Sequence, residues 1–203
     1  MGIRMERVLA RVFTALALLA WPLFVQADNL FWDGGTDDIG GTGNGVSDGG
    51  SGTWDNTIKN WETNAGAYFA WPKVANAHHA YFAGAGGTVT FGADRGNGGF
   101  YPNTVWVTNG NYVFDLGTNG LTFRGSGLQV FGGTLVLTNG TVTVVNSGIS
   151  VSGANALRIY SKVSGAINLS KTGGGDLYLY NDANDFTGSL VAQNGLGVYF
   201  TSI

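Results

Sequence analysis

Few residues in this chain are of the types that catalyse reactions or hold metal ions. His78 and His79 are its two histidines among 203 residues, and cysteine is absent. Adjacent residues on a strand point to opposite faces, so these imidazoles cannot bind one metal ion side by side. We predict no metal site there, no cofactor and no catalytic residues.

A glycine-rich stretch from Asp33 to Gly52 contains four aspartates that could bind calcium through carboxylate and carbonyl oxygens: Asp33, Asp37, Asp38 and Asp48. Their spacing matches neither the EF-hand loop nor the glycine–aspartate nonapeptide repeat. We expect a solvated loop here. A rise in melting temperature on adding millimolar calcium would indicate a calcium site instead.

The remaining candidates for chemistry are charged residues scattered through the second half of the chain. Cleavage of polysaccharides needs carboxylates and basic groups that converge on one groove. No such spacing is visible among Asp115, Arg124, Arg158, Lys162, Lys171 and Asp176. We therefore predict that the protein is not an enzyme.

Residues 1–27 have the pattern of a signal peptide. Three arginines precede an apolar run of about 14 residues, and Val25-Gln26-Ala27 forms a small-residue cleavage site. The run is shorter than the roughly 20 residues that span a bilayer, so we expect no membrane-spanning segment in the mature chain. Residues 28–203 contain seven basic and twelve acidic residues, a balance that does not favour nucleic acid as a partner.

Glycine is abundant, with 35 residues, whereas proline occurs only three times. Valine, threonine, leucine and aromatic residues lie between the glycines, and no segment after residue 28 has helical periodicity. This pattern predicts an all-β protein of short strands and tight turns.

Five blocks of seven residues follow one another from Leu121 to Asn155, each with two apolar positions and a turn. The first apolar positions are Leu121, Leu128, Leu135, Val142 and Ile149, and the second are Phe123, Val130, Leu137, Val144 and Val151. Glycine or asparagine occupies each turn, at Gly125, Gly132, Asn139, Asn146 and Gly153. Both residue types enter left-handed conformations at low cost, so a corner is expected every seventh residue.

The blocks can assemble in two ways, and periodicity alone does not decide between them. In a parallel β-solenoid, or β-helix, three blocks form a coil of about 21 residues, which stacks Leu121 near Val142 and Leu128 near Ile149. In an antiparallel meander or sandwich, Phe123 faces Leu128 across a hairpin. We favour the solenoid because it closes around its own core, whereas a lone meander leaves its apolar face uncovered.

Seven further strands are expected around the blocks: 88–91, 105–107, 112–114, 157–160, 167–169, 177–180 and 196–200. They place a β-helix over residues 88–203, preceded by a Gly/Trp-rich cap segment at 28–87.

Aromatic residues are concentrated before residue 88: Trp32, Trp54, Trp61, Tyr68, Phe69, Trp71, Tyr81 and Phe82. Exposed rings could stack on sugars, whereas buried rings would close the open end of a solenoid. We favour the cap because an uncovered first coil exposes apolar side chains and unpaired strand edges.

The segment Leu169-Ser170-Lys171-Thr172-Gly173-Gly174-Gly175-Asp176-Leu177-Tyr178-Leu179, with Asn184-Asp185-Phe186-Thr187-Gly188 and Asn194-Gly195-Leu196, resembles the autotransporter-associated β-strand repeat. Phe31-Trp32-Asp33-Gly34-Gly35 and the tryptophan motifs after it resemble the openings of such passenger proteins. The repeat covers about 167–200. The sequence departs from full autotransporters because it contains no series of ten-residue alternating strands typical of their membrane barrel.

The resemblance implies a right-handed parallel β-helix exported by a Gram-negative-type bacterium. It also implies a non-catalytic, structural or adhesin-like role at the cell surface or in the medium. The alternative is a secreted module that binds or degrades glycans. Expected partners are surface glycans or other extracellular matrix, and copies of the chain stacked end to end. A polysaccharide panel in binding and turnover assays would separate the two functions.

Overall fold

A computed structural model describes residues 28–34, 43–73, 78–93, 99–145, 147–165, 169–193 and 197–200 of the chain. Within these ranges every regular element is a β-strand, and the strands form three sheets of a parallel β-solenoid with about five coils. The prediction of an all-β solenoid is therefore confirmed. The predicted signal peptide, Asn146 and parts of the predicted repeat lie outside the described residues.

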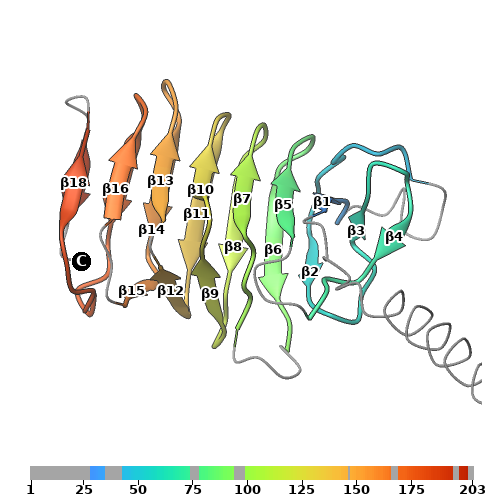
Figure 1. The fold of residues 1–203 in the computed structure, drawn as a ribbon, viewed down its shortest axis with the longest axis horizontal. Coiled ribbons are helices and arrows are strands. Elements are labelled where there is room, and N and C mark those ends of the chain that lie inside the picture. The colour runs from blue at the N-terminus through green and yellow to red at the C-terminus, as the bar shows by residue number, and fades with distance from the viewer. Residues whose placement is uncertain are drawn as a thin grey trace, which may run out of the picture.

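The largest sheet has nine strands, which run side by side across Figure 1. In spatial order they are β4 (Tyr68–Phe69), β3 (Trp61–Glu62), β1 (Asn29–Trp32), β5 (His79–Phe82), β7 (Thr104–Val107), β10 (Gly127–Val130), β13 (Gly148–Val151), β16 (Leu169–Thr172) and β18 (Leu190–Ala192). From β1 to β18 all neighbours are parallel, whereas β3 and β4 add antiparallel strands beyond β1.

The other two sheets complete each coil. The seven-stranded sheet contains, in order, β2 (Gly52–Trp54), β6 (Gly87–Phe91), β8 (Tyr112–Asp115), β11 (Thr134–Thr138), β14 (Ala156–Ile159), β17 (Asp176–Leu179) and β19 (Val198–Phe200). The three-stranded sheet contains β9 (Gly120–Phe123), β12 (Thr141–Val144) and β15 (Lys162–Ser164). The coils that begin with β7, β10 and β13 each supply one strand to each of the three sheets, whereas the other coils supply strands to the two larger sheets.

The predicted stacking of the seven-residue blocks is confirmed. Leu121 pairs with Val142 in the three-stranded sheet, and Leu128 pairs with Ile149 in the nine-stranded sheet, both in parallel register. Phe123 and Leu128 lie in different sheets, so the antiparallel meander is wrong for these blocks. The right-handed winding of the coils remains a prediction.

Most corners use the residues that the blocks predicted. Gly125, Asn139 and Gly153 have positive φ angles of 53°, 58° and 58°. At the second corner Gly133 has a φ of 80° and Gly132 does not lie in the left-handed region, so the predicted position is wrong by one residue.

Parallel pairing already begins within residues 28–87. Strand β1 pairs with β5, and β2 pairs with β6, so these segments belong to the first coils. The antiparallel strands β3 and β4 lie at this end of the nine-stranded sheet (Figure 1).

Inward side chains form columns that run along the axis and fill the interior. Leu121, Val142 and Val163 form one such column in the three-stranded sheet, and each is at most 1% exposed. Because alternate residues of a strand point inward, each coil adds one layer of apolar side chains to a continuous core.

Candidate binding surface

The two histidines lie on opposite sides of the wall, as the sequence predicted. His78 is buried, with its ring centroid 6.4 Å from that of Trp71, whereas His79 stacks at 4.8 Å on the half-buried Trp106 of the outer face. Desolvation lowers the pKa of both imidazoles; the Asp28 carboxylate partly opposes this for His78. Both shifts favour the uncharged form of the imidazole.

The described part of the aspartate-rich stretch is held by its own hydrogen bonds. The backbone N–H of Asp48 donates to Asp33 Oδ1 at 2.8 Å, and Asn44 Nδ2 donates to Asp48 Oδ2 at 3.0 Å. Asp37 and Asp38 lie outside the described residues. Within the described ranges, no three side chains of His, Asp or Glu are grouped to hold a metal ion.

The scattered charged residues lie at several places along the solenoid, and two of them, Arg158 and Asp176, share a neighbour. Asp115 Oδ1 accepts a hydrogen bond from Asn139 Nδ2 at 2.7 Å, and Arg124 is exposed at a corner. Arg158 and Asp176 both contact Tyr178: the guanidinium lies 5.5 Å from the ring centroid, and the Asp176 carboxylate accepts from the hydroxyl at 3.2 Å. These contacts do not bring two carboxylates together as glycoside hydrolysis requires.

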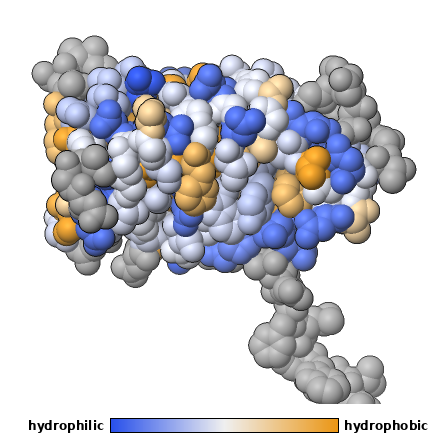
Figure 2. Space-filling view, turned by 90° about the horizontal axis from the view of Figure 1, so that it is seen from above, coloured by the Kyte–Doolittle hydropathy of each residue, from blue (hydrophilic) through white to orange (hydrophobic). Residues whose placement is uncertain are grey.

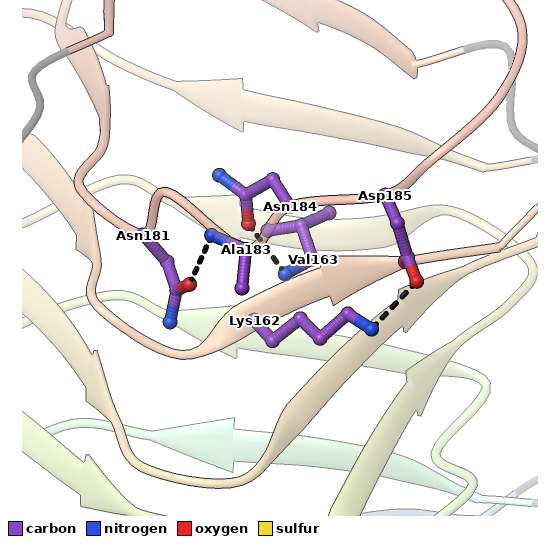
Figure 3. A network of polar contacts seen from close by, with 6 residues as sticks. All are labelled: Lys162, Val163, Asn181, Ala183, Asn184 and Asp185. Atoms are coloured by element: carbon purple, nitrogen blue, oxygen red, sulfur yellow. Dashed lines mark hydrogen bonds and ion pairs between the residues drawn. The ribbon is translucent and has the colours of Figure 1, made fainter.

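Lys162 belongs to a polar network that holds the segment after β17 (Figure 3). Its ammonium lies 2.5 Å from the Asp185 carboxylate, which lowers the pKa of Asp185. The backbone N–H of Val163 donates to Asn184 Oδ1 at 2.7 Å, so a side-chain amide takes the place of a backbone carbonyl beside β15. The Asn-Asp-Phe-Thr-Gly motif thus acts as a structural turn.

Lys171 is the charged residue whose position the sequence did not suggest. It is fully buried in a column between Ile149 and Ala192, and its Nζ donates to the carbonyls of Gly173 and Gly175 at 2.7 and 2.5 Å. Burial lowers the pKa of this lysine, partly offset by the Asp176 carboxylate. Its role is to anchor the triple-glycine corner from within.

Most of the early aromatic residues are interior, as the cap interpretation requires. Trp32, Trp54, Trp61 and Phe82 have no exposed surface, and Trp71 is 5% exposed. Trp54 has its ring centroid 4.8 Å from those of both Trp61 and Trp71. Three members of the predicted set differ: Phe69 is exposed, Tyr68 is half-buried, and Tyr81 lies half-buried on the outer face of the nine-stranded sheet.

Two rows of aromatic side chains lie on the outer faces. On the nine-stranded sheet, Phe31 and Tyr81 have centroids 5.1 Å apart, and Tyr81 and Trp106 are 4.3 Å apart. The indole Nε1 of Trp106 donates to Gln129 Oε1 at 3.1 Å. We call Phe31, Tyr81, Trp106 and Gln129 the tryptophan row.

The second row lies on the seven-stranded sheet and contains tyrosines of three successive coils. Tyr160 stacks on Tyr180 at 4.5 Å with an interplanar angle of 12°, and Tyr178 stacks on Tyr199 at 4.7 Å with an angle of 16°. Their planes are nearly parallel, so neighbouring rings cover each other's faces. We call these four residues the tyrosine row.

The surface seen in Figure 2 is mainly hydrophilic or intermediate, with small, separate hydrophobic patches. Hydrophobic residues also lie at the end of the solenoid where Figure 1 places β18. No helix among the described residues is long and apolar enough to cross a membrane.

Comparison with known proteins found one informative similarity. The chain is 26% identical over 238 aligned residues to the protein "Adhesin BmaC autotransporter" of Brucella suis biovar 1 (strain 1330), and the match covers 87% of this chain. The chain spans only 7% of that adhesin's length. No model of a protein family and no solved structure matches the chain.

Proposed function

We propose that this chain is a non-catalytic, adhesin-like β-solenoid that acts at a bacterial cell surface or in the medium. The observation that carries the proposal is the similarity to a segment of the Brucella adhesin, which covers most of this chain. The solenoid supports it because an adhesin needs a stiff scaffold with long lateral faces on which binding groups can be repeated.

The way the interior is filled favours mechanical stiffness. Parallel backbone ladders join successive coils in all three sheets, and apolar side chains fill the space between the sheets. The chain has no cysteine, so no disulfide contributes to this stiffness. Local opening of one coil would break hydrogen bonds on both of its sides. Such a scaffold suits a protein that works outside the cell, where proteases are present.

Export is part of the proposal and rests on residues 1–27, whose sequence has the order of regions found in signal peptides.

The absence of catalysis is also part of the proposal. It is supported by the contacts of the ionisable side chains, since Asp115, Lys162 and Lys171 are each engaged in bonds that hold corners or turns.

Attachment to cells tests the proposal directly. Beads coated with the purified chain should be retained on a layer of animal cells more strongly than beads coated with an inert protein. The same preparation should release no reducing sugar from a panel of polysaccharides. Retention equal to the inert control would refute an adhesin-like function, and measurable turnover would refute the non-catalytic part.

A further inference from the structure

The tryptophan row continues along the solenoid as a line of uncharged side chains. Each member pairs in register with the next on the neighbouring strand, in the order Phe31, Tyr81, Trp106, Gln129, Ser150 and Thr172. With strands about 4.8 Å apart, six members extend over about 24 Å. This length accommodates several consecutive sugar rings.

The rings in this line are arranged differently from those of the tyrosine row. The planes of Phe31 and Tyr81 are inclined by 30°, and those of Tyr81 and Trp106 by 38°. All three side chains are half-buried, so each ring keeps part of its surface in contact with solvent. The parts of these rings that remain exposed can pack against the C–H faces of sugars.

Polar neighbours hold the indole of Trp106 in place. Gln129 accepts its N–H and also donates from Nε2 to the carbonyl of Ser126 at 3.3 Å, while His79 stacks on the ring. The binding surface is therefore ordered before a ligand arrives, which reduces the entropy lost on binding. The amide of Gln129 and the hydroxyls of Ser150 and Thr172 can bind sugar hydroxyls.

We infer that the line from Phe31 to Thr172 binds an extended, electrically neutral polysaccharide. This inference rests on the proposed function and names the ligand class of the adhesin-like surface. No member of the line is ionised, whereas an anionic polymer would require arginine or lysine along the same path. The tyrosine row is a weaker candidate for a neutral ligand because the charged side chains of Arg158 and Asp176 both contact Tyr178 within it.

Titration calorimetry with the purified chain tests the inference. The probes are the neutral polysaccharides mannan, galactomannan and dextran, with polygalacturonate as an anionic comparison. We expect at least one neutral probe to bind, and Trp106→Ala to weaken that binding about tenfold or more. Tyr160→Ala is the matched control, because Tyr160 is an exposed aromatic residue directly after β14 of the seven-stranded sheet, and it should leave binding unchanged.

Melting curves must show that both variants fold, and Trp106→Phe, which keeps a ring, should retain part of the affinity. Binding only to polygalacturonate, no binding to any neutral probe, or equal loss in both alanine variants would overturn the inference. If cells retain the coated beads but no neutral probe binds, the adhesin-like function stands and the ligand class is wrong. If a neutral polysaccharide binds in a Trp106-dependent way but cells do not retain the beads, the ligand class stands and the adhesin-like function is wrong.

Discussion

Lys171 places an ammonium group where neighbouring coils place apolar side chains. Desolvation opposes the charged form, while the carbonyls of Gly173 and Gly175 accept its hydrogen bonds. Because the folded state lowers the pKa of this lysine below its usual 10.5, the unfolded chain holds the proton more tightly. The charge therefore costs stability at neutral pH.

The free energy of unfolding should consequently increase as the pH rises from the folded pKa of Lys171 towards 10.5. Lys171→Met removes this titration. The free energy of unfolding of the variant should therefore decrease relative to that of the wild type as the pH rises over the same range. Urea unfolding at several pH values between 8 and 10.5 measures it. Tyrosines also titrate near the top of this range, but they are common to both proteins and cancel in the difference. A constant difference would contradict the assignment.

Trp54 is the residue whose loss should weaken the aromatic core most. Its ring lies close to those of Trp61, Trp71 and Phe91, and it has no exposed surface. Trp54→Ala should lower the free energy of unfolding by about 3–5 kcal/mol, because it leaves a large cavity. Denaturant unfolding measures the change, with the half-buried Trp106→Ala as the variant expected to lose less. Equal losses would argue against an interior role.

At the scale of the strand, the distance between coils depends on glycines that leave no room for a side chain. Gly127 begins β10 with a φ of 72°, and a Cβ there would lie far inside van der Waals contact with the carbonyl oxygen of Gly148 in the next coil. Gly153 has a similar φ of 58°, but a Cβ there would meet open space.

Substitutions at Gly127 and Gly153 distinguish the cost of backbone strain from the cost of forcing two coils apart. Gly153→Ala should cost about 1–2 kcal/mol, the usual cost of a left-handed residue with a side chain. Gly127→Ala should cost more, because the strain is the same and the strands must also move apart. Equilibrium unfolding of both variants provides the comparison. If Gly127→Ala were no worse than Gly153→Ala, close approach of the strands would not limit the fold.

The sequence predicted the stacking of strands because the inward positions repeat. An apolar residue at every inward position of residues 121–151 leaves little freedom in the register, and Leu121 and Val142 pair as expected. Corners were less certain, because adjacent glycines such as Gly132 and Gly133 can exchange roles. Lys171 could not be assigned to the core from its residue type alone.

The tryptophan row was not predicted, because outward residues need not repeat. Trp106 and Gln129 are far apart in the sequence, and only the register of β7 and β10 makes them neighbours. A search at a spacing of one coil would have found them, since Tyr81, Trp106 and Gln129 recur at nearly that interval. The contact of Trp106 with His79 depends on side-chain conformation, which no spacing reveals.

At the scale of the whole molecule, the two extremes of the described solenoid differ. Strands β3 and β4 lie beyond β1, and tryptophans fill the interior beside them. On β18 and β19, in contrast, Val191 is 47%, Tyr199 45% and Phe200 60% exposed. Exposed apolar groups beside strand edges are sites at which chains associate.

We expect copies of the chain to associate through β18 and β19 as the protein concentration rises. Replacing Phe200 by Ser and Val191 by Lys should shift the apparent mass from light scattering towards that of the monomer. Phe69→Ser is the control, since Phe69 is also exposed but lies on β4. A wild-type protein that remains monomeric at all concentrations would contradict the expectation.

The register also limits how such a protein can change in length. Paired residues are 21 positions apart for Leu121 and Val142, 22 for Leu135 and Leu157, and 20 for Leu157 and Leu177. Extra residues can be absorbed at a corner, as between the paired Phe31 and Tyr81, which are 50 positions apart, whereas one residue inserted within a strand would turn apolar side chains outward. Gene duplication should therefore extend this architecture in steps of roughly one coil, each of which adds about 4.8 Å of reach and one more rung to any ligand-binding line on its face.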